Sequence, residues 1–336
     1  MILAFLVYFF ILFIAVTFGY IASHKHIKLQ LYNKYILLPI IIISLIVGFR
    51  YLVGTDWESY HFLYNQALAD FLSVGNIFTS TMEPLYIVLN LVLAFFQVPY
   101  QMFFAVVMMI HLCLLYKSFK DYVWLLPLGL FFYFTSVFTT SLNIQRQTMS
   151  FCVFLFATNY YRNGNAVKYV LSIFIAISMH YSSIILLPIY LLRSKVFSFL
   201  DNRCIDILLY AISFFLFEHI LNIINSILTT YVTNAKYLSN MALLGNADME
   251  VNSGLGILIF HFLDLLIILY SRKMSIYFEQ IHFKYLYRAF LLGVIFANVF
   301  GNDVFLSRVP FALENLRFLM LAFLVYYLFA HKRILS

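Results

Sequence analysis

Long apolar runs separated by short polar segments recur along the whole chain. Runs of about 20 apolar residues are long enough to cross a hydrocarbon core of about 30 Å as helices. Short alternating segments, which would indicate a membrane β-barrel, do not dominate the pattern. We therefore predict an all-α polytopic integral membrane protein, with crossings at about 2–22, 35–50, 100–116, 122–139, 145–161, 205–225, 255–271, 284–300 and 317–330.

Two apolar segments fit this scheme less simply. Residues 84–98 are short and end at Pro99, whereas residues 169–192 are long and carry His180 near their middle. Each is consistent with a half-helix or a re-entrant hairpin, so the expected total is about 10–12 transmembrane or re-entrant helices. We predict one transmembrane domain over residues 1–336, with outer loops at about 50–83, 226–254 and 301–316.

Composition supports the membrane assignment. The chain is 64% apolar and 10% charged, with a mean hydropathy of +0.93, whereas soluble domains carry about 25% charged residues. The first run lacks a basic start and a cleavage site, so we expect a retained helix. The three cysteines have neither metal-binding nor redox spacing.

The basic residues predict the orientation, because cytoplasmic loops are enriched in lysine and arginine. With the N-terminus outside, one net crossing over 84–116 and a hairpin at 169–192, ten of the eleven lysines become cytoplasmic. The C-terminus is then also cytoplasmic. The net charge of +7 therefore reflects basic inner loops rather than nucleic-acid binding.

Four arginines are expected at or near the outer surface, against this rule: Arg50, Arg146, Arg308 and Arg317. Arginine binds phosphate or carboxylate through two parallel hydrogen bonds. Four arginines with almost no lysine favour an anion-binding site. The alternative is that each arginine pairs with a nearby acid and braces a loop, as the i, i+3 pair Glu314–Arg317 would do.

Further polar residues are expected on the same side. Thr55 and Glu58 have the spacing of a capping box, and Trp57 and Tyr60 fit an interfacial aromatic belt, but neither explanation requires Asp56. Glu83 precedes Pro84, where an acid suits a helix N-terminus. His180 is the candidate for proton transfer, with a satisfied packing histidine as the alternative.

The stretch "SLNIQRQTMSFC" places Asn143, Arg146, Gln147 and Ser150 at i, i+3, i+4 and i+7, on one face of a predicted helix. A polar face there predicts a protein-lined cavity, and the alternative is a hydrogen-bonded contact between helices. Sequence motifs for nucleotide, zinc-protease or serine-hydrolase chemistry are absent, and so is a DxD pair. No metal and no cofactor is therefore expected.

The order of these motifs resembles the EpsG/Wzy-type family of polysaccharide polymerases, which includes O-antigen and capsule polymerases. "FRYLVGTDWESY" resembles the family's Arg…Gly-Thr-Asp-x-x-x-Tyr stretch, and "MEPLYIVLN" its Glu-Pro segment. "NIQRQTMSFCVFLFATNYYRNG" resembles the Arg-Gln helix, "HYSS" the His-x-Ser motif, and "SRVPFALENLRFLM" the last arginine-bearing segment.

The resemblance implies a membrane glycosyltransferase that joins oligosaccharide repeat units carried on undecaprenyl pyrophosphate, at the outer face of the bacterial cytoplasmic (inner) membrane. It implies that arginines bind the leaving pyrophosphate and that Asp56, Glu83 or His180 activates the acceptor hydroxyl. The expected substrate-binding residues are Arg50, Arg146, Gln147, Arg308, Arg317, Tyr60 and Asn143. The expected partners are the lipid-linked oligosaccharide, membrane lipid, a chain-length regulator and a flippase.

Three other functions remain open from the sequence. A glycan ligase would use the same carrier and the same arginines. A flippase or transporter for lipid-linked sugar would favour internal repeats and charges through the whole membrane depth, whereas no repeat is found and the arginines cluster at one face. A membrane acyltransferase built around His180 would need a route for its acyl donor.

Overall fold

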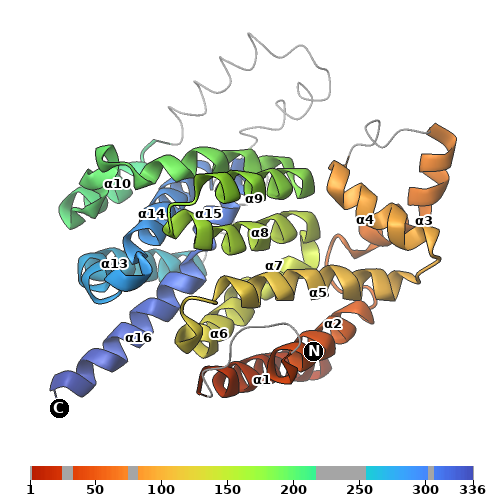
Figure 1. Ribbon diagram of the computed structural model, residues 1–336, viewed down its shortest axis with the longest axis horizontal. Helices are drawn as coiled ribbons and strands as arrows, with labels where there is room; N and C mark the ends of the chain where they lie inside the picture. The colour runs from red at the N-terminus through yellow and green to blue at the C-terminus, as the bar shows by residue number, and fades with distance from the viewer. Residues whose placement is uncertain (1, 25–32, 75–81, 217–254, 302–305, 336) are drawn as a thin grey trace, which may run out of the picture. The chain divides into compact units, whose positions relative to one another are not determined.

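The computed structural model describes residues 2–24, 33–74, 82–216, 255–301 and 306–335. Within these ranges all regular structure is helical, as predicted (Figure 1). The chain divides into two compact units, Met1–Tyr190 with Val325–Ser336, and Leu191–Leu324. The expected outer loop at 226–254 lies outside the described residues, as do parts of the loops at 50–83 and 301–316.

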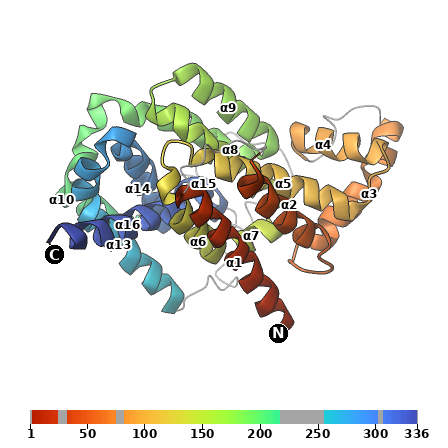
Figure 2. The same cartoon turned by 60° about the horizontal axis from the view of Figure 1, so that its bottom comes forward.

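The first unit contains ten helices among its described residues, followed by most of a 3-10 helix. They are α1 (Ile2–His24), α2 (Lys34–Gly48), α3 (Trp57–Val74), α4 (Pro84–Phe95), α5 (Tyr100–Ser118), η2 (Val123–Leu125), α6 (Leu126–Ser136), α7 (Phe138–Asn143), α8 (Gln145–Arg162), α9 (Ala166–Met179) and η3 (Tyr181–Arg193). Helix α1 packs on α2 and α6, α2 on α5, and α8 between α5 and α9 (Figures 1 and 2). Helix α8 is buried along nearly its whole length.

The second unit is built from shorter segments and three long helices. They are η4 (Lys195–Asp201), α10 (Arg203–Ser213), α13 (Leu255–Tyr277), η5 (Glu279–Ile281), α14 (Phe283–Phe300), η6 (Leu306–Arg308), α15 (Phe311–Glu314) and α16 (Arg317–Leu335), whose last part belongs to the first unit. Helix α14 approaches α15 closely, because a Cβ at Gly293 would lie 2.4 Å from the backbone of Leu313.

Five of the described helices are long and apolar enough to cross a membrane: Ala4–His24, Tyr100–Ser118, Leu255–Tyr277, Phe283–Phe300 and Phe311–His331. The bent pair η3 and η4 would make a sixth. Four shorter apolar helices correspond to further predicted segments. The total of 10–12 transmembrane or re-entrant helices and the orientation of the termini stay predictions. Predicted and observed ends agree within a few residues for α1, α5, α8 and α14.

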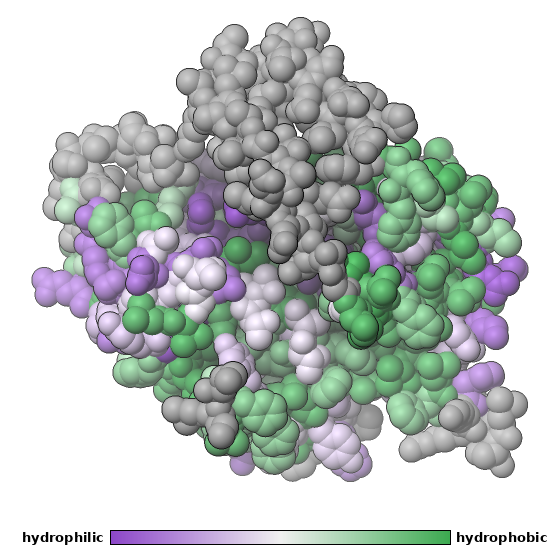
Figure 3. Space-filling model, turned by 180° about the vertical axis from the view of Figure 1, so that it is seen from behind, coloured by the Kyte–Doolittle hydropathy of each residue, from purple (hydrophilic) through white to green (hydrophobic). Residues whose placement is uncertain are grey.

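Apolar side chains cover much of the visible surface (Figure 3). Phe5, Phe174 and Phe262 are each more than half exposed, on α1, α9 and α13. Large exposed apolar areas are rare on soluble proteins and mark contacts with lipid or partners. Together with the long apolar helices, they indicate a multi-pass membrane protein.

The segment at 169–192 forms the predicted hairpin. Helix α9 ends at Met179, His180 has extended backbone, and η3 begins at Tyr181. The two arms lie side by side, because the Tyr169 hydroxyl donates to the carbonyl of Leu186 at 2.6 Å and the Tyr190 hydroxyl to that of Gly164 at 2.7 Å. His180 therefore lies at the tip.

Two local predictions were wrong. Thr55 does not cap α3, because that helix begins at Trp57 and the Asp56 carbonyl accepts from the Tyr60 amide at 3.1 Å. Asn143 does not share a continuous helix with Arg146, since α7 ends at Asn143 and the backbone breaks at Ile144, with φ −98° and ψ 62°.

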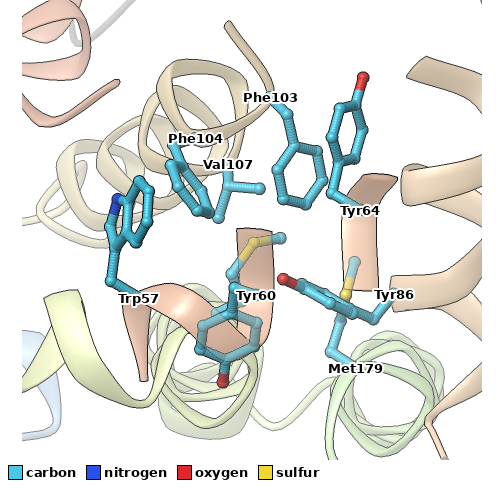
Figure 4. Packing of buried hydrophobic residues seen from close by; sticks show 9 residues of the cluster. Trp57, Tyr60, Tyr64, Tyr86, Phe103, Phe104, Val107 and Met179 are labelled. Carbon is cyan, nitrogen blue, oxygen red and sulfur yellow. The ribbon is translucent and has the colours of Figure 1, made fainter. Parts of the chain in front are cut away.

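The aromatic residues of α3 are also not an exposed belt. Trp57 and Tyr60 are 4% and 6% exposed and pack with Tyr64, Phe103 and Phe104 of the core cluster (Figure 4). Burying rings of this size removes about 150–250 Å² each from solvent. This cluster fixes α3 against α5 next to the polar residues described below.

Candidate functional site

The loop between α2 and α3 is held against the end of α7. The Thr55 amide donates to Asn143 Oδ1 at 3.0 Å. Gly54 has φ +100°, and a Cβ there would lie 2.5 Å from the same oxygen. Glycine is needed because only it enters this conformation without steric cost. Asn143 thus fixes the loop that carries Arg50 and Asp56.

Glu83 occupies the N-cap position of α4, with Pro84 as the first helical residue. Proline suits that position because its missing N–H would have no intrahelical partner. The Glu83 side chain makes no capping hydrogen bond and is buried. Its carboxylate is therefore available to other elements.

Two other helices supply partners for this carboxylate. Arg146, in the first turn of α8, donates from Nη1 to Oε2 of Glu83. His180, after the last turn of α9, places Nδ1 2.7 Å from Oε1. The amide of Tyr181 also lies 3.4 Å from Oε1. Glu83, Arg146 and His180 were each predicted from the sequence as site residues, and the structure brings them together.

These contacts fix the ionisation of Glu83. Burial opposes the charged form, but the hydrogen bond to His180 and the charge of Arg146 outweigh it, so the pKa of Glu83 falls to about 2. An ionised carboxylate only accepts hydrogen bonds, so Nδ1 of His180 carries a proton. In the neutral imidazole, Nε2 is then the acceptor.

Aromatic and amide groups extend this cluster. Tyr60 of α3 lies within hydrogen-bonding reach of Arg146. The Tyr86 hydroxyl donates to Gln145 Oε1 at 3.4 Å. Tyr60 and Tyr86 contact each other edge to face, with ring centroids 6.0 Å apart (Figure 4). The Arg146 guanidinium is thus bordered by a phenol and a carboxylate.

Two serines join α8 to the hairpin. Ser150 and Ser183 are hydrogen bonded through their hydroxyl groups, and both are buried. At Ser150 the predicted polar face of α8 makes a hydrogen-bonded contact between helices, which was the alternative to a cavity. Arg146, on the same helix, binds Glu83. Gln147 is buried in the same helix.

Arg50 lies deeper than expected for a loop residue. It is 8% exposed, and Nε, Nη1 and Nη2 have no hydrogen-bond partner among the described residues. Its guanidinium carbon is 5.2 Å from the centre of the Phe104 ring. Burial lowers the pKa of Arg50 to about 10. The adjoining cavity of about 10 Å³ has room for about one water molecule.

Asp56 is partly buried beside Tyr60 and accepts a 3.5 Å hydrogen bond from the Thr55 hydroxyl. No ion pair to Asp56 occurs within the described part of the chain. Asp56 is therefore a carboxylate close to the site, and among the described residues no cation pairs with it.

The remaining two predicted arginines belong to the second unit. Arg317 binds Asp264 through Nε at 2.7 Å and Nη2 at 3.0 Å, and Glu314 through Nη1 at 3.1 Å. Its contacts match the bracing alternative, with Asp264 as an interhelical strut. Arg308 is exposed at the end of η6. Their roles in substrate binding stay predictions.

Sequence reasoning missed Tyr86, Gln145 and the pairing of Ser150 with Ser183. Tyr86 had no distinguishing signal among many tyrosines, whereas Gln145 and Ser183 stood inside quoted motifs. Among the residues that the structure describes, three or more histidine, cysteine or acidic side chains do not gather in a metal-binding group. Metal-independent chemistry stays a prediction.

Comparison with known proteins gives one match. The family model described as "EpsG family" matches residues 33–335, nearly the whole chain. No curated protein and no solved structure matches the chain.

Proposed function

Because this chain belongs to the EpsG family, we propose that it is a polysaccharide polymerase of the bacterial inner membrane. It joins oligosaccharide repeat units carried on undecaprenyl pyrophosphate at the outer face of that membrane. The observation that carries the proposal is the Glu83 carboxylate, bound between Arg146 and His180 at a junction of helix ends. This arrangement places a cation that can bind a phosphate, Arg146, close to an imidazole with a fixed orientation, His180.

His180 acts as the general base. Glu83 holds the proton on Nδ1, which leaves Nε2 to accept a proton from the attacking sugar hydroxyl. A pKa of about 2 makes Glu83 itself a weak base, so its role is to orient the imidazole and to stabilise the imidazolium that forms. The pairing resembles the way a carboxylate orients a catalytic histidine in hydrolases.

The transfer step balances without an added reactant. The acceptor oxygen forms a bond to the anomeric carbon of the growing chain, while the bond from that carbon to the pyrophosphate oxygen breaks. The leaving pyrophosphate takes the electron pair, and the hydroxyl proton goes to His180. Arg146, bordered by Tyr60, stabilises the charge that develops on the leaving group.

The other predicted residues have supporting roles in this proposal. Asp56 is the second candidate base, because it lies beside Tyr60 and forms no ion pair among the described residues. Arg50 reaches the pyrophosphate only after moving from its buried position, since the adjoining cavity is much smaller than a phosphate. Asn143 positions the loop and Gln147 supports Arg146 from the same helix, while substrate binding by Arg308 and Arg317 stays a prediction.

The test uses purified protein with a lipid-linked repeat unit, scored for a ladder of polymer lengths. We expect Arg146→Ala and His180→Gln each to reduce the polymerisation rate at least about 100-fold. His331→Gln, a change at an exposed histidine of α16, is the matched control and should retain wild-type activity. Full activity in both Arg146→Ala and His180→Gln would contradict the assignment.

The same assay separates the rival functions and the role of metal. A chelator should leave the ladder unchanged, and loss of the ladder would overturn the metal-independent mechanism. Cells without this protein should accumulate single-unit glycans, whereas loss of a ligase leaves polymer on its carrier. The chain-length regulator and the flippase stay predicted partners.

A further inference from the structure

A cavity of about 830 Å³ lies within the second unit, apart from the Glu83 cluster. Its lining comes from two chain segments, 198–202 and 271–287. The volume is in the range of small-molecule sites, which is about 300–1,000 Å³. Both segments adjoin or include the basic stretches predicted to face the cytoplasm, so the proposed polymerisation at the outer face gives this cavity no role.

The balance of charge in the cavity is positive. Arg272 and Lys284 line it, and both side chains are exposed and have no ion pair within the described residues. Asp201 also lines it, but Arg288 binds that carboxylate through two hydrogen bonds, at 2.9 and 2.7 Å. The other carboxylate that lines the cavity is Glu279, which has no ion pair among the described residues. Two cations, Arg272 and Lys284, therefore face one acid that is not already paired with a cation.

Hydroxyl groups supply neutral donors to the same space. Ser198, Ser271 and Ser275 line the cavity, together with Tyr285 and Tyr287. The lysine and arginine side chains supply the charge, and the hydroxyl groups add directional hydrogen bonds. Phosphate oxygens accept hydrogen bonds from both kinds of donor. The Ser271 hydroxyl already donates to the Ile268 carbonyl at 2.8 Å and the Tyr287 hydroxyl to Asp206 at 2.8 Å, so Ser198 and Ser275 are the hydroxyl groups proposed to bind the ligand.

The backbone at the rim adds a second indication. His282, the N-cap of α14, has φ +56° and ψ 41°, the left-handed conformation, and makes no side-chain capping hydrogen bond. A residue other than glycine is uncommon there, and such strain gathers at ligand-binding sites. His282 and the first-turn residues Phe283 and Lys284 line the cavity, so the N-terminal end of this 18-residue helix borders it, and the helix dipole there favours a negative group.

We propose that this cavity binds a phosphate-bearing anionic ligand through Arg272 and Lys284. Two sources share this chemistry: the headgroup of an anionic phospholipid and a free phosphate compound. Arg272 and Lys284 supply the charge, Ser275 supplies a hydrogen bond, and the bound phosphate adds a regulatory input.

The experiment measures thermal stabilisation of the full-length protein in two arms. In detergent, inorganic pyrophosphate is titrated as the free probe. In nanodiscs, phosphatidylcholine alone is compared with a mixture containing phosphatidylglycerol. We expect a shift in unfolding temperature in at least one arm, weakened about fivefold in apparent affinity by Arg272→Gln or by Lys284→Gln.

Lys273→Gln is the matched control, because this exposed lysine adjoins Arg272 but does not line the cavity. Ser275→Trp narrows the cavity and removes one hydroxyl without changing any charge, and should weaken the same shift. A response in nanodiscs only, weakened by Arg272→Gln, assigns a lipid headgroup. A response to pyrophosphate in detergent that Arg272→Gln weakens assigns a free phosphate, whereas a response that Arg272→Gln leaves unchanged places the binding elsewhere and overturns the proposal. No response in either arm, or equal losses in Lys273→Gln and Arg272→Gln, would overturn the proposal.

Discussion

Glu83 is buried, negatively charged and bound by side chains that lie 63 and 97 residues further along the chain. Leaving such a carboxylate without partners costs several kcal/mol, so Arg146 and His180 stabilise the fold as well as the proposed chemistry. A substitution at Glu83 therefore affects both. Separating the two effects requires a measurement of stability beside one of activity.

The pH dependence of stability reports on Glu83 directly. Its pKa is about 2 in the folded protein against an ordinary value of 4.5, so the ionised form stabilises the fold above pH 4.5. The contribution of about 3 kcal/mol is lost as the pH falls from about 4.5 towards 2. Glu83→Gln should therefore show a flatter fall in unfolding temperature over that range than the wild type.

Glu58→Gln is the control for this measurement, since it changes an exposed carboxylate of α3. It should keep the wild-type slope over the same range, from about pH 4.5 to 2. Parallel curves for Glu83→Gln and the wild type would show that Glu83 is not held in its ionised form by the fold.

Among the elements, the loop between α2 and α3 shows how backbone geometry serves the site. Gly54→Ala adds a Cβ within 2.5 Å of Asn143 Oδ1 at a residue with φ +100°. We expect a loss of about 1–3 kcal/mol in stability or a displaced loop, with reduced polymerisation in either case. The measurements are thermal unfolding and the polymer ladder.

Gly256→Ala is the matched control, because no heavy atom lies within 4 Å of a Cβ at that helical position. Gly256 lies in the first turn of α13, so alanine there should leave stability unchanged or raise it by at most about 0.5–1 kcal/mol. If the two variants behaved alike, the close contact at Gly54 would have no bearing on the loop.

The long apolar helices could be predicted from the sequence because apolar length alone indicates them, whereas α3 lies within the predicted outer loop at 50–83 and the predicted crossing at 122–139 is broken into shorter helices. The break at His180 was also foreseeable, since a histidine and three serines interrupt a long apolar run. The break at Ile144 was not, because a polar residue pattern of i, i+3 and i+4 continues through it. Backbone breaks inside such a pattern depend on packing, which a single sequence does not reveal.

The members of the candidate site were predictable by residue type, but their pairings were not. Arg146, Glu83 and His180 each stood out as polar groups near the ends of apolar runs. Whether Arg317 would meet a ligand or the carboxylate of Asp264 depended on which helices are neighbours. The burial of Trp57 similarly required α5, so the interfacial interpretation failed.

For the whole molecule, the predicted orientation can be tested by labelling with a membrane-impermeant maleimide. The variant Glu58→Cys, in a Cys204→Ser background, should react in intact cells because α3 is expected outside. In the otherwise unchanged protein, the exposed Cys204 should react only after the membrane is opened. This follows from the positive-inside rule, which places the segment 193–203 in the cytoplasm.

The opposite labelling pattern would show that the topology is the reverse of the predicted one. The Glu83 cluster would then face the cytoplasm, and the cavity lined by Arg272 would face outwards. Glu58 and Cys204 belong to different units, so this pair tests the orientation of each unit separately.

The sequence separation within the Glu83 cluster also has a consequence for biosynthesis. The ribosome adds about 5–20 residues per second, so His180 follows Glu83 by about 5–20 s. During that interval the carboxylate has neither its histidine nor, for most of it, its arginine. The cluster therefore assembles only after α9 and His180 have been synthesised, and a nascent chain stalled before that point has no complete site.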